Sequence, residues 1–288
     1  MLSPITSVAA SSLESPPEPA RPSAGTPLAQ AWRWLLTMAD RFAPALAGIG
    51  LIVVWEISCR LFEIPTFLLP APSVILSGAM EQSWSTWASN VWATIRVALI
   101  GYLVAIAVSI PLAIALASSR LLSRTLYPLI VIIQATPIVA VAPIMVVVLG
   151  TSDVPRVAIT FLITFFPIVV ATTTGLLATP EEMIELSRSL RAGRTREIFH
   201  IRLPFAVPYI FSALKISITL AFVGAVVAEF VAAEQGLGYF IQFATSFFKI
   251  AQAFAALIVL VAISLLSFQL VSLAQGLLVP WSLPKSER

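Results

Sequence analysis

The residues of this sequence that could do chemistry are few, and most of them gather in one stretch. Residues 185–204, ELSRSLRAGRTREIFHIRLP, hold five arginines, two glutamates and the only histidine, His200. Guanidinium groups bind phosphates and carboxylates through charge-assisted hydrogen bonds. One histidine and one cysteine, Cys59, are too few for a zinc site. This charged segment (residues 185–204) therefore predicts electrostatic binding, and we expect neither catalytic residues nor a metal in this chain.

The sequence around the charged segment predicts two short helices joined by a sharp turn. Thr179 is a suitable N-cap, Pro180 suits the first helical position and Glu182 completes a capping box. Gly193 is expected to stop the first helix. The second helix, REIFHIRL, is expected to end at Pro204.

Physical reasoning from the residues leaves two interpretations of the charged segment. One is a positive anchor that rests on anionic lipid headgroups. The other is a docking element for a second protein, favoured by an apolar edge of Met183, Leu186 and Leu190 at helical spacing. Charge alone favours the first interpretation, and the paired helices favour the second.

The rest of the chain is mostly apolar. Of its 288 residues, 59% are hydrophobic and 11% are charged, and the mean hydropathy is +0.97. Soluble domains carry about 25% charged residues. The apolar residues fall in long runs, so the sequence predicts an all-α integral membrane protein.

Six runs are long enough to span a bilayer, which needs about 20 apolar residues. They are Pro44–Phe62, Val91–Ala117, Leu126–Leu149, Val157–Leu177, Phe205–Ala232 and Phe254–Leu278. With the N-terminus inside, most of the 17 basic residues fall on the inner side. The positive-inside rule therefore predicts that both termini are cytoplasmic. The two long outer segments are too apolar for free loops, and each is expected to hold a short helix.

A few polar residues interrupt the expected spans. Gln134 and Thr136 could line a translocation path or join helices by hydrogen bonds. Glu229 lies in an apolar run and is a functional candidate by default, although a structural role is favoured. Glu56 and Arg96 lie near the outer ends of the first two spans and are expected to pair.

The charged segment resembles the cytoplasmic motif of permease subunits of binding-protein-dependent ABC importers. That motif reads E-A-A, three residues, G, nine residues, I, one residue, L-P. Glu185 begins it here, and Ile201, Leu203 and Pro204 close it at the family's spacing. Arg191 stands at the glycine position, and Gly193 is expected to supply the turn instead. FLLPAPSVI, ATIRVALIGYLVAIAVSIPLAIAL and VVAEFVAAEQGLGYFI resemble nitrate/sulfonate/taurine-type permeases in the family's order.

The resemblance implies the six-helix fold of a type I ABC importer permease in the bacterial plasma (inner) membrane. It implies a homodimer on two ATP-binding subunits, which bind ATP and Mg²⁺, with an extracytoplasmic solute-binding protein and no nucleic acid. The solute would be a small anion of the sulfonate, nitrate or taurine kind, or a related small organic molecule. The residues that would couple this chain to the ATPase are Glu185, Arg188, Leu190, Arg191, Gly193, Ile201, Leu203 and Pro204.

The expected organisation has four parts. They are a disordered cytoplasmic tail at 1–40, a first span and outer segment at 41–89, a core permease domain at 90–278 with a coupling loop at 179–204, and a cytoplasmic tail at 279–288. Two other functions are weighed: an integral membrane enzyme, and a self-sufficient secondary transporter. The sequence lacks the clustered acids, histidines or cysteines that such an enzyme would need, and it lacks the internal repeats typical of such a transporter. We therefore expect a transport subunit that is not itself an enzyme.

Overall fold

The protein is represented by a computed structural model that describes residue 43 and residues 46–282. The chain divides into two compact units between Val54 and Trp55. In the first unit, residues 46–54 are helical. The second unit begins with helical residues 55–61 and contains every element named below. The tail expected at 1–40 and the last six residues of the tail expected at 279–288 lie outside the described residues.

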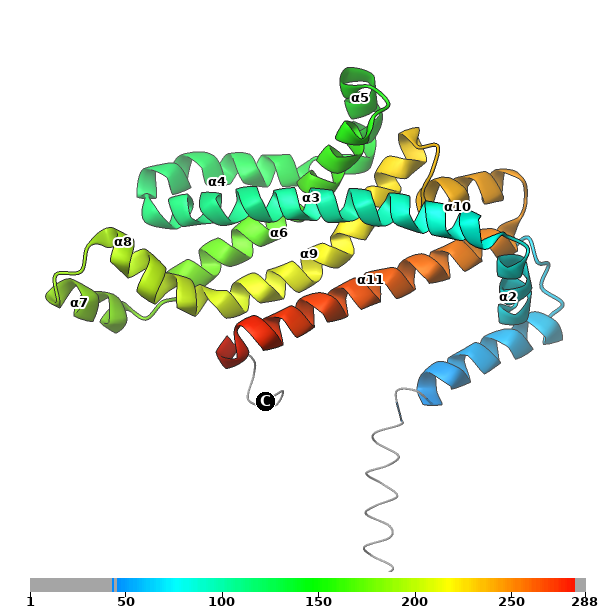
Figure 1. Cartoon of the computed structure of the whole chain (residues 1–288), viewed down its shortest axis with the longest axis horizontal. Helices are drawn as coiled ribbons and strands as arrows, with labels where there is room; N and C mark the ends of the chain where they lie inside the picture. The colour runs from blue at the N-terminus through cyan, green and yellow to red at the C-terminus, as the bar shows by residue number, and fades with distance from the viewer. Residues whose placement is uncertain (1–42, 44–45, 283–288) are drawn as a thin grey trace, which may run out of the picture. The chain divides into compact units, whose positions relative to one another are not determined.

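Every element described in the second unit is helical (Figure 1). Four helices are long: α3 (Trp84–Ser118), α6 (Asp153–Leu177), α9 (Leu203–Ala232) and α11 (Ile250–Leu278). The shorter ones are α2 (Pro72–Met80), α4 (Arg120–Ala135), α5 (Ile138–Leu149), α7 (Glu181–Ser189), α8 (Arg194–Glu197), the π-helix η1 (Ile198–Arg202), α10 (Leu237–Ser246) and the 3₁₀ turn η2 (Pro280–Ser282). The α7–α8 corner lies at one end of the bundle and α10 at the other (Figure 1).

The core of the second unit forms where α3, α6 and α9 pack against one another. Val97, Ile168 and Phe222, one from each helix, are fully buried in it. Thr160 of α6 lies between Gly101 of α3 and Gly224 of α9. An added Cβ on Gly101 would stand 2.6 Å from the Thr160 Cβ, and one on Gly224 would stand 2.9 Å from the Thr160 Cα. Small residues at such crossings let helix backbones approach closely in a membrane.

The described helices account for most of the expected spans. Residues 84–118, 153–177, 194–232 and 250–278 each form a helix long and apolar enough to cross a bilayer. The α4–α5 pair meets the same test only when its two members are taken together. The helix at residues 46–61 coincides with the expected first span but is not among these candidates. The described residues therefore hold four candidate spans, or five if the pair counts as one.

The expected span at Leu126–Leu149 is broken in its middle into two helices. The chain bends by 94° between α4 and α5. Thr136 adopts an extended conformation, with φ −74° and ψ 126°, because the following Pro137 disfavours helical geometry at the residue before it. Proline also lacks the N–H that would continue the helix. Hydropathy alone does not register this break.

The two short helices expected in the outer segments are confirmed as α2 and α10. The long helix after α2 begins earlier than expected, at Trp84 instead of Val91. Ser83 caps it, since its Oγ accepts a hydrogen bond from the Thr86 N–H at 3.2 Å. Trp87 belongs to this helix, and its indole N–H donates a hydrogen bond to the carbonyl of Ala79 in α2 at 3.0 Å.

We expect Gly101→Ala to destabilise the bundle by about 1–3 kcal/mol, because its methyl group overlaps Thr160. Gly48→Ala is the matched control: it is also helical, and an added Cβ meets nothing within 4 Å. The control should be neutral or stabilising by up to about 1 kcal/mol, since alanine favours helix over glycine. Thermal unfolding of the full chain in detergent measures both. Equal melting temperatures would contradict the close approach at Thr160.

Candidate functional site

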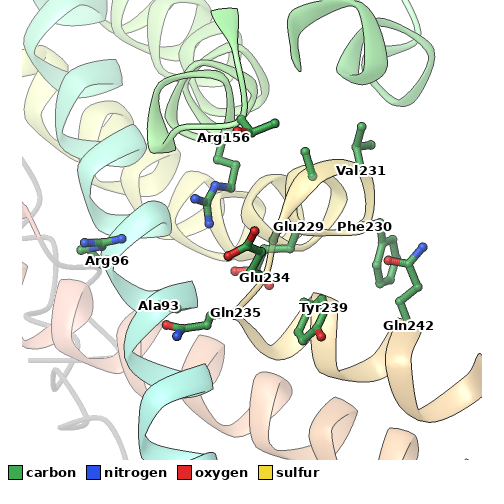
Figure 2. A pocket seen from close by; sticks show the side chains of 13 residues that line it. Ala93, Arg96, Arg156, Glu229, Phe230, Val231, Glu234, Gln235, Tyr239 and Gln242 are labelled. Atoms are coloured by element: carbon green, nitrogen blue, oxygen red, sulfur yellow. The ribbon is translucent and has the colours of Figure 1, made fainter. Parts of the chain in front are cut away.

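The residues proposed for a translocation path do not form one cluster. Gln134 and Thr136 are exposed at the α4–α5 bend, where the Thr136 hydroxyl donates to the Ile132 carbonyl at 3.2 Å. Glu229 lies near the α10 end of α9 and borders a cavity that neither of these two residues lines (Figure 2). These residues therefore lie in two separate places, and their part in a translocation path stays a prediction.

The carboxylate of Glu229 is held by hydrogen bonds inside the protein. The residue is 1% exposed, Oε1 accepts from the Thr94 hydroxyl at 2.8 Å, and Oε2 accepts from the Gly238 N–H at 2.7 Å. Asn90, one turn before Thr94, accepts from the Gly236 N–H at 2.9 Å. Glu229 therefore ties α3 to the start of α10. In the sequence, the only signal that could have pointed to Asn90 and Thr94 is their spacing of four residues, which places them on one helix face.

A second cluster of charges corrects an expected pair. Glu56 pairs with Arg60 at 2.6 Å, not with Arg96. The guanidinium of Arg96 instead contacts Asp153 at 2.5 Å, and Arg156 contacts the other oxygen of the same carboxylate at 2.5 Å. Asp153 at the start of α6 thus joins α6 to α3. A helix N-terminus favours an acidic residue at this position.

At the other end of the bundle, α7 begins differently from the expected capping box. Pro180 precedes the helix, and no side chain caps it. The hydroxyl of Thr179 donates backwards, to the Leu176 carbonyl at 3.2 Å, because it lies buried against the end of α6. Glu181 and Glu182 stand in the first turn, where the helix dipole favours negative charge.

The turn after α7 is made by Arg191. This residue adopts φ 54°, and its N–H bonds the Arg188 carbonyl at 2.9 Å. The Ala192 N–H bonds the Ser187 carbonyl at 3.0 Å. These two bonds form a Schellman motif, in which a left-handed residue ends the helix. The expectation that Gly193 supplies the turn is wrong, because Gly193 is extended with φ −66°. Arg191 takes the left-handed conformation itself, at the position where the motif has glycine.

The second helix of the charged segment does not end at Pro204, as the sequence predicted. α8, η1 and α9 run on as one helix from Arg194 to Ala232. Pro204 occupies the first turn of α9, and the π-helical turn at Ile198–Arg202 lies immediately before it. A π-turn changes the hydrogen-bond register, so proline is accommodated without a break. α8 and α9 are therefore parts of one continuous helix.

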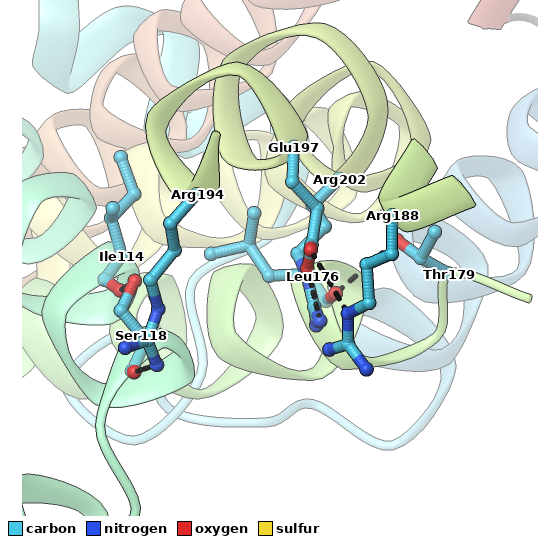
Figure 3. Close-up of polar contacts among 8 residues, drawn as sticks. All are labelled: Ile114, Ser118, Leu176, Thr179, Arg188, Arg194, Glu197 and Arg202. Atoms are coloured by element: carbon cyan, nitrogen blue, oxygen red, sulfur yellow. Dashed lines mark hydrogen bonds and ion pairs between the residues drawn. The ribbon is translucent and has the colours of Figure 1, made fainter. Parts of the chain in front are cut away.

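Glu197 joins the parts of this corner, and sequence analysis did not single it out. It is 7% exposed, and its Oε1 accepts from Nε and Nη2 of Arg202 at 2.8 and 2.7 Å (Figure 3). Its Oε2 lies 3.6 Å from Nε of Arg188 on α7. Arg194 donates to the Ser118 carbonyl, at the C-terminal end of α3. One buried acid thus connects α7 to the start of α9, and a neighbouring arginine connects α8 to α3.

The remaining residues of the charged segment divide between inward and outward positions. Ile184 and Ser187 are buried on the inner face of α7. The apolar edge of Met183, Leu186 and Leu190 is uncovered, with Leu190 74% exposed. Glu185 is also exposed, as is Pro204, whereas Ile201 and Leu203 are half-buried. An uncovered apolar edge beside exposed arginines is suited to contact another surface.

Comparison with known proteins gives a consistent match. Residues 105–282 match the family described as "Binding-protein-dependent transport system inner membrane component". The formylaminopyrimidine transport permease protein ThiX of Halalkalibacterium halodurans is 34% identical over 238 residues, which cover 83% of this chain and 95% of that protein. The nitrate import permease protein NrtB of Synechocystis is 29% identical over 247 residues, covering 82% of this chain and 89% of that protein.

A solved structure also shares the fold. An inward-facing conformation of the MetNI methionine ABC transporter matches with a TM-score of 0.57 at 21% sequence identity. The match covers 68% of this chain and 95% of that one.

The left-handed turn at Arg191 predicts that glycine is preferred there. Arg191→Gly should stabilise the chain by about 1 kcal/mol, since left-handed backbone costs a non-glycine residue about that much. Gly193→Ala should be neutral, because its φ is ordinary and an added Cβ meets nothing within 4 Å. Thermal unfolding in detergent compares the two. A large loss of thermal stability in Gly193→Ala would instead indicate that Gly193 supplies the turn.

Replacing the shared acid should loosen this corner. Glu197→Gln keeps the side-chain size but leaves two guanidiniums without their carboxylate, at a cost of about 1–3 kcal/mol. Glu185→Gln, an exposed position on the outer face of α7, is the control and should leave the melting temperature unchanged. If the two variants melt alike, Glu197 does not hold α7 to α9.

Proposed function

Because the chain belongs to the family of binding-protein-dependent transport system inner membrane components, we propose that it forms the solute path of an ABC importer and is driven by ATP hydrolysed in a separate subunit. It is a permease subunit and a multi-pass protein of the bacterial inner membrane. The observation that carries the driving step is the unbroken helix from Arg194 to Ala232, which joins the charged segment to a candidate span.

The geometry of the charged segment supports a coupling role. Glu185 and Arg188 of α7, and Leu190 and Arg191 directly after it, are exposed and available to a partner. The exposed Arg188 also reaches the buried Glu197, which is bound in turn by Arg202. A push on α7 would therefore reach the base of α9 through these ion pairs. Gly193 links α7 to α8, and Ile201, Leu203 and Pro204 continue into the span.

The proposed topology has six spans with both termini in the cytoplasm. It takes the four long helices, the α4–α5 pair and the helix at residues 46–61 as the spans. The positive-inside rule then puts the charged segment in the cytoplasm and α2 and α10 on the outer side. In this scheme, 1–40 and 279–288 are cytoplasmic tails, 41–89 is the first span with its outer segment, and 90–278 is the core domain with a coupling loop at 179–204.

The proposed assembly is a homodimer of this chain on two ATP-binding subunits, with an extracytoplasmic solute-binding protein. ATP and Mg²⁺ are bound by the partner subunits. Closure of the ATPase pair moves the α7–α8 corners, and packed helices then alternate access between the two sides. The solute is a small anion of the nitrate, sulfonate or taurine kind, or a related small organic molecule. The names of the two relatives span that range, with formylaminopyrimidine in one and nitrate in the other.

Reconstitution tests this function. The full chain is placed in proteoliposomes with or without the ATPase encoded beside it, together with the binding protein and its radiolabelled solute. We expect uptake only when the ATPase and ATP are both present. Uptake driven by an ion gradient without the ATPase would replace the proposal with a secondary transporter. Chemical conversion of the solute by the chain alone would replace it with an enzyme.

A variant of the docking edge tests the coupling role. Leu190→Ser removes an exposed apolar side chain and should weaken association with the ATPase about tenfold, without lowering the melting temperature. Leu121→Ser, at an equally exposed leucine in α4, is the control and should bind normally. Pull-down of the ATPase at graded concentrations measures the difference. Equal binding by both variants would place the docking surface elsewhere.

A further inference from the structure

A cavity of about 620 Å³ opens beside Glu229 at the α10 end of the bundle (Figure 2). Residues of α3, α6, α9, α10 and the segment between α9 and α10 line it. Its volume lies within the range of about 300–1,000 Å³ that is typical of small-molecule sites. It therefore has room for a solute larger than a simple inorganic ion.

The two positive charges of this cavity share one counter-ion. Arg96 and Arg156 line it, and both bind the carboxylate of Asp153 at 2.5 Å. The side chain of Arg156 is 13% exposed, whereas those of Asp153 and Arg96 are 37% and 47% exposed, so water reaches this cluster of charges. An oxyanion entering the cavity would have to displace this carboxylate from both guanidiniums.

Two carboxylates also line the cavity. Glu229 and Glu234 line it, in addition to the Asp153 carboxylate that holds the arginines. Glu229 is occupied by Thr94 and Gly238, while Glu234 is exposed and makes no ion pair among the described residues. With Asp153 beside its arginines, the cavity offers an anion no excess of positive charge, and its carboxylates can accept from a ligand that donates hydrogen bonds.

The uncharged lining residues fit a flat ring. Tyr239 and Phe230 present aromatic side chains, and Gln235 and Gln242 present amides that both donate and accept hydrogen bonds. Glu234 lines the cavity from the segment between α9 and α10, and Tyr239 lines it from α10 (Figure 2). Aromatic faces stack on a planar ring, and the amide and carboxylate oxygens accept from its N–H groups.

We propose that this cavity is a solute site and that it takes an uncharged or cationic, amino-bearing nitrogen heterocycle in preference to an oxyanion. This inference rests on the proposed transport function and narrows its range of solutes. Asp153 acts as an internal counter-ion that excludes anions, and Tyr239 supplies the stacking face. The relative that is named for an aminopyrimidine is also more similar to this chain than the one named for nitrate, at 34% against 29% identity.

The test measures binding to the full chain in nanodiscs, by equilibrium dialysis with radiolabelled cytosine, taurine and nitrate. We expect cytosine to bind more tightly than either anion. Tyr239→Leu should weaken cytosine binding about tenfold, and the control Tyr127→Leu, in α4 away from the cavity, should not. Asp153→Asn should produce taurine or nitrate binding that the unmodified chain lacks, because it frees Arg96 and Arg156.

Three outcomes would overturn this inference. They are binding of taurine or nitrate by the unmodified chain at least as tight as that of cytosine, equal cytosine binding by Tyr239→Leu and Tyr127→Leu, and no gain of anion binding in a folded Asp153→Asn chain. Folding of each variant is checked by its melting temperature. Because dialysis needs no ATPase, ATP-dependent uptake of an anion would leave the transport function intact while rejecting the heterocycle. Failure of the ATPase to drive uptake would reject the function itself.

Discussion

Gly101 of α3 and Gly224 of α9 bring two helix backbones against Thr160 of α6, and this close approach sets the spacing of the bundle. In a bilayer, helices gain little from hydrophobic burial against each other, so contact depends on small residues and on packing. The cavity near α10 and the charged corner near α8 lie at opposite ends of the helices that meet here (Figure 1). Both depend on the rigid spacing in between.

The helix that includes α9 has a buried acid near each end. Glu229 binds Thr94 and the start of α10, and Glu197 binds Arg202 and Arg188. A buried carboxylate is costly unless hydrogen bonds and opposite charges compensate it, so each acid stabilises one local arrangement. The helix from Arg194 to Ala232 is therefore anchored to its neighbours at both ends. This double anchoring suits the proposed role of carrying motion from a partner subunit into the bundle.

Many of the few charged residues of this apolar chain lie in two groups, one in the charged segment and one at the α10 end of the bundle. Those of the charged segment are partly exposed, where lipid or another protein can meet them. At the α10 end, Asp153 holds two arginines. Two arginines facing a cavity would suggest an anion site from composition alone. Their shared carboxylate weakens that conclusion, because an anion would have to compete with it for both guanidiniums.

Hydropathy runs and the asymmetry of arginines indicated a membrane protein with a charged inner segment. The resemblance of residues 185–204 and of three apolar segments to ABC importer permeases identified the family, which the match over residues 105–282 confirms. These features are local or periodic, so they can be recognised without knowing which residues are in contact. The tertiary structure decided the 94° bend at Pro137, the left-handed turn at Arg191 instead of Gly193, and the role of Glu197. It also decided that Arg96 pairs with Asp153 and not with Glu56. Each of these depends on which neighbours a residue meets in space, and residue type and spacing do not contain that information.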